Sequence, residues 1–271
     1  MKKIYLTLSL ACLSFSSFAE VDFRPVLGRD VDRANIYNPR KSNWVSTFGF
    51  DAQGLLSKRD FEALSKNYTD KTELLVGPRV GIGREFHLFW GLYTKSTIEG
   101  YFVGTLFEPT KKVSGGDSKA DNSYTKKKGN IYGAEAAQSL SFVTEFHIPN
   151  YFSENKIKMY FEPFIEAAIG VGKGYYRFDY VFNESTGSER YSNKMEETFL
   201  SQRVSAGMNF IGTNGYFLTL KASALNHQVT KGNNMIYAQP NGAGATRTET
   251  DLKDETIKFD YNVFIGGGYK W

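Results

Sequence analysis

Apolar and polar side chains alternate with a period of two along the last part of the chain. From Ile257 to Trp271 the odd positions are apolar or aromatic apart from Gly267, whereas the even positions apart from Phe264 are polar or small. Successive side chains of a β-strand point to opposite faces, so this stretch predicts one strand with a single apolar face. Its length of about fifteen residues is large for a strand of a soluble sandwich and suits a tilted strand that crosses a membrane and protrudes beyond it.

The same alternation recurs in earlier segments of the chain. Trp44 and Phe48, for example, share the apolar face of the first segment. The fourth segment places Phe146 on its apolar face, which Gln138 and Thr144 interrupt. The seven further segments are residues 44–53, 74–83, 90–104, 132–148, 159–171, 200–210 and 216–224. With the terminal strand they predict eight strands.

The polar connectors between these segments alternate between short and long ones. The short connectors are residues 84–87, 149–156 and 212–215, and the long ones are residues 55–71, 108–129, 182–196 and 228–255. Outer-membrane barrels have short periplasmic turns and long extracellular loops. We therefore expect both ends of the barrel to lie in the periplasm and four loops to face outward.

These patterns together predict an all-β fold, a transmembrane antiparallel up-and-down β-barrel of eight strands over residues 43–271. An even strand number is what bacterial single-chain barrels require. Residues 20–42 are predicted to form a periplasmic tail or a plug of the lumen. An extra strand through residues 21–27 is the alternative, and one more pair of strands would give ten.

The first residues have the order of a secretory signal peptide. Lys2 and Lys3 precede an apolar run that is too short to span a bilayer, and the small-x-small pattern that follows ends at Ala19. Cleavage after Ala19 would remove residues 1–19. The single cysteine, Cys12, would leave with them, whereas a lipoprotein signal would retain it as the lipidated first residue. Ser9 occupies the position where a lipoprotein signal has a Leu-like residue.

Composition adds two exclusions to this picture. The formal charge of +4 falls to +2 without Lys2 and Lys3, which is too small to favour a nucleic-acid partner. A mature chain without cysteine has no disulfide, thiol nucleophile or thiolate-bound metal. With 17 Tyr, 22 Phe and 26 Gly, the chain has the aromatic and glycine content of alternating strands rather than of a helical core.

The terminal segment resembles the terminal strand signal of outer-membrane proteins. The positions that match this signal are Tyr261, Val263, Ile265, Tyr269 and Trp271. The overall pattern resembles the small OmpA/OmpX-like and OmpW-like barrels over residues 44–271. This resemblance implies localisation in the Gram-negative outer membrane and recognition by the barrel-assembly machinery. Members of such families are structural anchors, adhesins, resistance factors or narrow channels.

The inward positions of the predicted strands collect ionisable side chains of both signs. An eight-stranded barrel is just wide enough for side chains to fill its interior, and charges confined there must pair. Asp51 and Glu145 belong to this set in addition to the residues of the predicted polar network. The predicted network consists of Arg79, Lys95, Glu99, Glu135, Glu162, Glu166, Arg203, Lys221, Lys258 and Asp260. It predicts an ion-pair plug, or alternatively the lining of a narrow polar path.

The second long connector is cationic and is the first candidate for a binding surface. Residues 108–129 contain six Lys against Glu108, Asp117 and Asp121. A cationic loop above lipopolysaccharide would attract its phosphates, although a solvated flexible loop has the same composition. The last long connector, rich in Gly, Asn and Thr, has the composition of a mobile and adhesive loop.

Some small outer-membrane barrels are enzymes, so the sequence can be compared with their catalytic motifs. Lipid A deacylases and outer-membrane phospholipases present a His-x-Ser pair. The chain has no such pair, because none of His87, His147 and His227 has a serine two positions later. No metal-ligand cluster or cofactor motif occurs either. We therefore expect a non-enzymatic barrel that contacts outer-membrane lipid, lipopolysaccharide or an external partner. A narrow porin-like channel is the alternative, and a lipid A-modifying enzyme is the third hypothesis.

Overall fold

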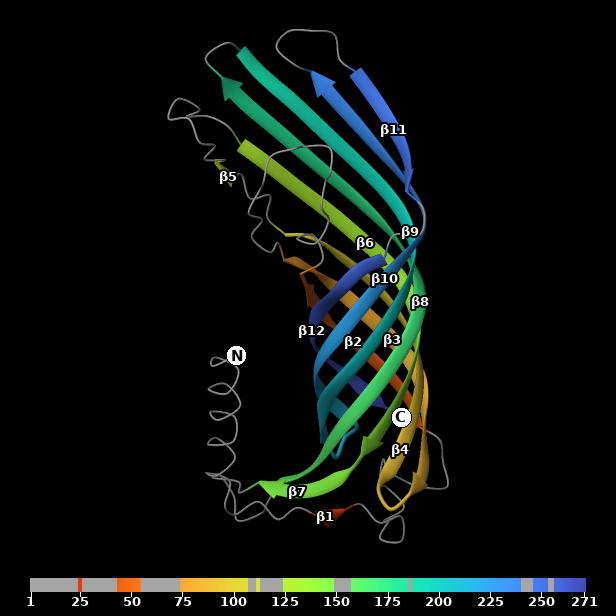
Figure 1. The fold of residues 1–271 in the computed structure, drawn as a ribbon. Helices are drawn as coiled ribbons and strands as arrows, with labels where there is room; N and C mark the ends of the chain where they lie inside the picture. Colours follow the sequence, from red (N-terminus) through yellow and green to blue (C-terminus); the bar gives the residue numbers. More distant parts are fainter. Residues whose placement is uncertain are drawn as a thin grey trace, which may run out of the picture.

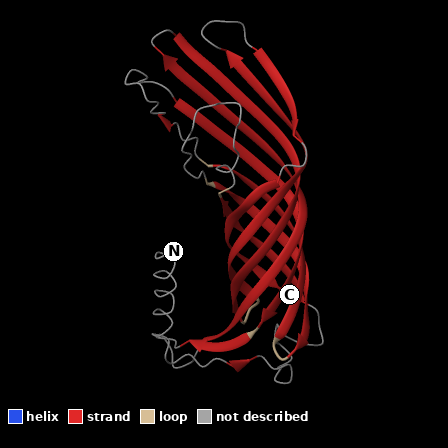
Figure 2. Cartoon of the chain, in the orientation of Figure 1, coloured by secondary structure: helices blue, strands red, loops and turns tan. Residues whose placement is uncertain are grey.

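The computed structural model describes residues 24–25, 43–54, 74–106, 111–112, 124–148, 157–184, 187–239, 246–252 and 256–271. The predicted signal peptide, Cys12 and nearly all of residues 20–42 lie outside these ranges. In the described part, the regular elements are all strands (Figures 1 and 2). No helix in these ranges is long and apolar enough to cross a membrane.

Eight strands form a closed antiparallel ring in the order β12-β2-β3-β4-β6-β8-β9-β10, and β10 pairs with β12 to complete it. Neighbours along the chain are neighbours in the ring, so the predicted eight-stranded up-and-down barrel is confirmed. The ring strands are β2 (Asn43–Gln53), β3 (Leu75–Phe89), β4 (Leu92–Thr105), β6 (Tyr124–Phe142), β8 (Ile157–Glu184), β9 (Gly187–Gly212), β10 (Tyr216–Gln239) and β12 (Thr256–Lys270).

Four shorter strands lie beside this ring. They are β1 (Arg24–Pro25), β5 (Lys111–Lys112), β7 (Thr144–Ile148) and β11 (Thr246–Leu252). Strand β7 continues the line of β6 along β8 after an interruption at Val143. Strand β1 falls within the segment of the ten-strand alternative, but it pairs with β7 outside the ring. The described strands therefore do not form a ten-membered ring.

The outer wall of the ring is apolar and its interior is polar. Large aliphatic side chains such as Ile98, Ile169 and Val204 are 67–70% exposed on the outside. Ionisable and hydroxyl side chains of the alternate positions are buried on the inside. This arrangement inverts the usual distribution of a soluble protein, and it follows from the period-two alternation that predicted the strands.

Three predicted long connectors are wrong, because the strands continue into them. Strands β8 and β9 extend through most of residues 182–196, and β10 with β11 extends into residues 228–255. Strand β6 begins at Tyr124 inside the predicted connector 108–129. The extended strands rise as a curved sheet on one side of the ring (Figure 1). Beyond an apolar belt a strand keeps its backbone pairing but no longer needs an apolar outer face, so a prediction based on that face stops too early.

The predicted turn at residues 84–87 is also wrong. Strand β3 continues to Phe89, and the hairpin to β4 is made by Trp90 and Gly91, whose φ angles are 45° and 75°. Positive φ at both central residues is the geometry of the tight hairpin turns whose twist matches that of the strands. Gly91 adopts it without cost, whereas Trp90 is an unusual residue there.

An apolar cluster fills the lumen at the end of the ring where this hairpin lies. Its members are Val45, Tyr93, Val143, Tyr160, Ile211 and Phe217. Phe146, which the sequence places on the outer face, is buried instead. The register with β8 is unchanged across Val143, since Ser141 pairs with Phe164 and Thr144 with Phe161, so Phe146 keeps the outer face of β6 although its side chain is buried.

Candidate functional site

The middle of the lumen contains an ion-pair cluster centred on two arginines. The guanidinium of Arg79 on β3 donates from Nε to Asp51 at 2.5 Å, and from Nη1 to Glu99 at 2.9 Å and Glu135 at 2.8 Å. Arg203 on β9 donates to the same Glu135 at 2.9 Å and the same Glu99 at 2.6 Å. The two arginines therefore share two carboxylates, which makes one connected network rather than separate pairs.

The network extends to the other side of the ring through Glu166 and Lys221. Glu166 Oε1 accepts from Arg203 at 2.6 Å and from Lys221 Nζ at 2.9 Å. Lys221 Nζ also lies 3.6 Å from Glu99 Oε1. Lys221 belongs to β10 and Glu99 to β4, and four strand pairings separate these strands in either direction around the ring. Side chains from opposite walls thus meet inside the lumen.

A second ion-pair cluster lies closer to the end of the ring that carries the C-terminus. Lys270 Nζ on β12 donates to Glu85 on β3 at 2.7 Å and to Glu162 on β8 at 2.9 Å. Glu162 also accepts from Ser141 at 2.7 Å and from Asn209 at 2.9 Å. All three charged side chains are 1% exposed. Removal of either partner of such a pair would leave a buried charge without compensation.

The structure places most of the predicted lumen residues in these clusters. Lys95 is buried as well, with its Nζ 5.3 Å from the ring centre of Phe164. The predicted residues with described side chains are Arg79, Lys95, Glu99, Glu135, Glu162, Glu166, Arg203 and Lys221, and all are buried. The side chains of Lys258 and Asp260 lie outside the described part.

Glu145 lies on the inward face that the sequence predicts, because its register partner is the buried Tyr160, but it sits at the end of the ring. Its carboxylate forms an ion pair of 2.7 Å with Lys158, in which the two side chains are 22% and 39% exposed. This pair lies on the β7–β8 hairpin, beyond the interruption at Val143. Glu145 is therefore partly exposed because of its place at the end of the ring, and the register of its strand is unchanged.

Sequence reasoning missed Glu85 and Lys270. Glu85 falls in the connector that was predicted at residues 84–87, although it continues the inward series of Arg79, Gly81 and Gly83. Lys270 lies on the predicted inward face of the terminal strand. The inward alternation contains both residues, if it is continued past Gly83 to Glu85 and followed to the end of the terminal strand at Lys270.

Other buried polar groups lie outside these two clusters. Tyr176 donates to Glu197 at 2.9 Å, and the His227 ring stacks on Phe199 with ring centres 4.2 Å apart. Gln53 Nε2 and, within the first cluster, the second carboxylate oxygen of Asp51 (Oδ1) are buried without a hydrogen-bond partner. Polar atoms of this kind are sites for water inside a barrel.

The described residues contain no group of three or more His, Cys, Asp or Glu side chains that would hold a metal ion. His87 lies near the β3–β4 hairpin and His227 is stacked in the lumen. The side chain of His147 is outside the described part. His227 is the direct register partner of Ser201, whose side chain is also buried and donates to Glu135 at 3.1 Å.

The terminal strand lies where the sequence predicts it, with Tyr261, Val263, Ile265 and Trp271 exposed on the outer wall. The backbone N–H of Trp271 donates to the carbonyl of Trp44, and the N–H of Trp44 donates back to Trp271, both at 3.0 Å. The Tyr269 ring stacks on Trp271 with centres 5.8 Å apart. The last residue therefore closes the ladder between the final and first strands of the ring.

These features define the class of fold: an all-β antiparallel barrel of eight strands with buried ion pairs inside the ring. No protein-family model and no curated protein matches the chain. Among solved structures, it is similar to Ail, the attachment invasion locus protein of Yersinia pestis, at 14% identity and a TM-score of 0.34, over 85% of this chain and 99% of that chain.

Two further solved structures show a comparable likeness. The outer membrane protein OprG from Pseudomonas aeruginosa is 11% identical with a TM-score of 0.37, over 85% of this chain and 96% of that chain. A major outer membrane protein from Thermus thermophilus is 9% identical with a TM-score of 0.38, over 84% and 99%. The barrel assignment rests on the strand pairing of this chain itself, not on these likenesses.

Proposed function

We propose that this protein is a non-enzymatic, integral outer-membrane barrel whose lumen is closed by ion pairs and whose extended strands and loops contact lipopolysaccharide. The outer wall supports a bilayer environment. Isolated exposed apolar side chains are common on soluble proteins, but a contiguous belt of them around a ring is not. The chain ends would face the periplasm and the extended sheet would face outward.

The contact between Lys221 and Glu99 carries the proposal of a closed lumen. These side chains come from opposite strands, and 3.6 Å separates Lys221 Nζ from Glu99 Oε1. A path for solutes along the axis would have to displace this pair and the two arginines beside it. An eight-stranded barrel leaves no other interior space of that width.

A row of cations on the extended strands supports contact with lipopolysaccharide. Lys128 on β6, Arg177 on β8 and Lys194 on β9 are direct neighbours in the strand registers, and all three are exposed. A row of cations on one face of the extended sheet would attract the phosphates of lipopolysaccharide. Glu196 is exposed in the adjacent row on one side, and Asp179 belongs to the adjacent row on the other side.

Planar-bilayer recording tests the closed lumen. The folded wild-type protein is expected to give no reproducible single-channel step. Arg203→Ala removes the side chain that bonds Glu99, Glu135 and Glu166, and we expect it to open a small cation-selective step lined by these carboxylates. Arg84→Ala, on the outer wall, is the matched control and stays silent. A wild-type step that is abolished by changing Arg79 or Glu162 would instead establish the narrow channel.

The absence of catalysis needs its own measurement, since small barrels include lipid A-modifying enzymes. Incubation of the folded protein with lipopolysaccharide, followed by mass spectrometry of lipid A, is expected to leave the acyl pattern unchanged. A time-dependent change in acyl chains that requires the folded protein would establish the enzyme instead.

A further inference from the structure

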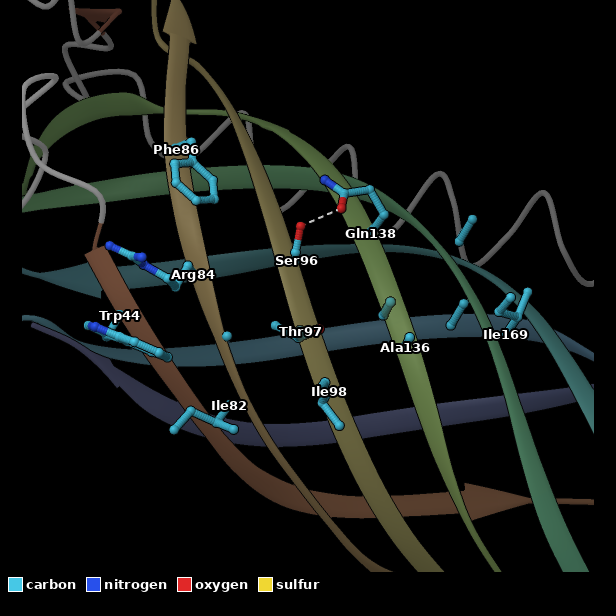
Figure 3. A pocket seen from close by; sticks show the side chains of 14 residues that line it. Trp44, Ile82, Arg84, Phe86, Ser96, Thr97, Ile98, Ala136, Gln138 and Ile169 are labelled. Atoms are coloured by element: carbon cyan, nitrogen blue, oxygen red, sulfur yellow. Dashed lines mark hydrogen bonds between the residues drawn. The ribbon is translucent and has the colours of Figure 1, made fainter.

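The outer wall of the barrel has a hollow of about 690 Å³ that crosses strands β2, β3, β4, β6 and β8. This volume lies within the range of small-molecule sites. Most of its lining is apolar, with Ile82, Ile98 and Ile169 on three different strands (Figure 3). The small side chains of Ala136 and Ala167 leave the wall recessed between them.

A polar row crosses this otherwise apolar hollow. Arg84, Ser96 and Gln138 are consecutive partners in the registers of β3, β4 and β6, so they lie side by side on the outer wall. Ser96 Oγ donates to Gln138 Oε1 at 2.5 Å, and the Gln138 amide nitrogen donates to Thr94 Oγ1. A glutamine amide has two donors and two acceptor lone pairs, so Gln138 has capacity beyond these two bonds.

Arg84 is held at one end of the row by aromatic rings. Its guanidinium carbon lies 5.1 Å from the ring centre of Trp44 and 5.7 Å from that of Phe86. Trp44 pairs with Trp271, so Arg84 lies near the end of the ring that carries the C-terminus. In the orientation proposed above, this end is at the periplasmic interface, where aromatic belts and long cationic side chains meet lipid headgroups.

We propose that this hollow is a binding site for one glycerophospholipid of the periplasmic leaflet. The planar guanidinium of Arg84 matches the phosphate, to which it can donate two hydrogen bonds. Ser96 and Gln138 lie where the ester groups of the glycerol backbone follow the phosphate. An acyl chain occupies the recess over Ala136 and Ala167, against the three isoleucines. The inference rests on the proposed membrane location and orientation.

The structure favours a phospholipid over lipid A as the occupant. Lipid A belongs to the outer leaflet, and the proposed orientation places Arg84 at the opposite one. Arg84 is the one cation among the described residues that line the hollow, and one cation beside an apolar recess fits one phosphodiester better than the two phosphates and several acyl chains of lipid A. The row of cations at Lys128, Arg177 and Lys194 lies on the extended strands and is a separate surface.

Native mass spectrometry of the full-length protein in detergent tests the site, with dioleoyl phosphatidylglycerol as the probe. The wild-type protein is expected to retain one lipid, and Arg84→Gln is expected to reduce retention roughly tenfold or more, as for loss of a charge-assisted bond. Ala167→Phe fills the recess and should also reduce retention. Lys158→Gln changes another cation near this end and should retain lipid as the wild type does.

Two comparisons separate this site from ordinary annular lipid. Dioleoylglycerol, which has the same chains without the phosphate, should be retained far less than phosphatidylglycerol. Equal retention of the two lipids, equal retention by wild type and Arg84→Gln, or preferred retention of lipid A would overturn the proposal.

The same preparations distinguish this inference from the proposed function. A barrel that inserts into bilayers and stays silent, but retains no phospholipid, overturns this site and leaves the closed surface barrel standing. A protein that is soluble without detergent and shows no heat-modifiable migration on a gel overturns both.

Discussion

Lys270 and Glu85 are separated by 185 positions in the chain, and 2.7 Å separates Lys270 Nζ from Glu85 Oε2 inside the lumen. Strand β2 lies between their strands in the ring. The pair therefore joins the last strand of the ring to the second one, β3, across the seam that closes the barrel. Because Lys270 also bonds Glu162, a single ammonium group offsets two buried carboxylates.

Lys270→Met is expected to lower the free energy of unfolding by about 3–5 kcal/mol, since it leaves Glu85 and Glu162 buried without their cation. Urea titration of the detergent-folded protein, followed by circular dichroism, measures the change. Adding Glu85→Gln to this variant should recover part of the loss.

Lys158→Met is the control for a cation of the same length. Its pair with Glu145 is partly exposed, so its removal should cost within about 1 kcal/mol. Equal losses for Lys158→Met and Lys270→Met would contradict a stabilising role for the buried cluster.

A second prediction concerns the packing of inward aromatic rings on glycines. Phe164 on β8 pairs with Gly207 on β9, and a Cβ at Gly207 would lie 2.6 Å from both Phe164 Cζ and the carbonyl oxygen of Leu220. Gly207→Ala should therefore lower the free energy of unfolding by about 1–3 kcal/mol.

Gly100 provides the comparison, because a Cβ there meets only Val80 Cγ2 at 3.9 Å. Gly100→Ala should leave the urea midpoint unchanged or raise it. A midpoint for Gly207→Ala that matches the wild type would show that the ring of Phe164 moves away at no cost.

The sequence predicts the ring because each membrane-crossing strand has an apolar outer face. The exposed positions of β12, such as Tyr261 and Ile265, follow the period of two that the residues themselves display. The strand ends follow no such rule. Lys173 and Arg177 place cations on the outer face there while pairing continues, so the strand is revealed by its backbone partners on β6 and β9.

For the lumen, the alternation identifies which charges point inward but not which ones meet. Arg203 and Glu99 bond because three strand pairings and the curvature of the ring bring their walls together. The alternation also does not give the burial of every outward residue: Phe146 lies on the outer face by the register of β7 with β8, yet its side chain is buried.

The cationic row on the extended strands is expected to bind lipopolysaccharide in a salt-dependent manner. Replacing Lys128, Arg177 and Lys194 together by Gln should weaken binding of the detergent-folded protein to immobilised lipopolysaccharide by about tenfold or more, since each charged contact with phosphate contributes roughly 1.5–3 kcal/mol. Raising the salt concentration should weaken the wild type and leave the triple variant nearly unchanged. Undiminished binding by the triple variant would remove this row as the contact surface.

At Trp271, the effect of a side chain on assembly in the cell can be separated from its effect on the stability of the folded barrel. Its backbone closes the ladder with Trp44, and these two hydrogen bonds survive a change of side chain. Its indole is 53% exposed and stacks on Tyr269 at the outer edge of the ring.

If the side chain serves mainly as the terminal signal for the barrel-assembly machinery, Trp271→Gln should sharply reduce heat-modifiable protein in outer-membrane fractions. Refolding of the purified variant into detergent should give nearly the wild-type yield. Trp90→Gln is the matched control, since Trp90 is 76% exposed at the β3–β4 hairpin but lies outside the terminal strand. Equal defects in cells for both variants would indicate loss of an interfacial anchor rather than of a terminal signal, because the two indoles share exposure and differ in their place along the chain.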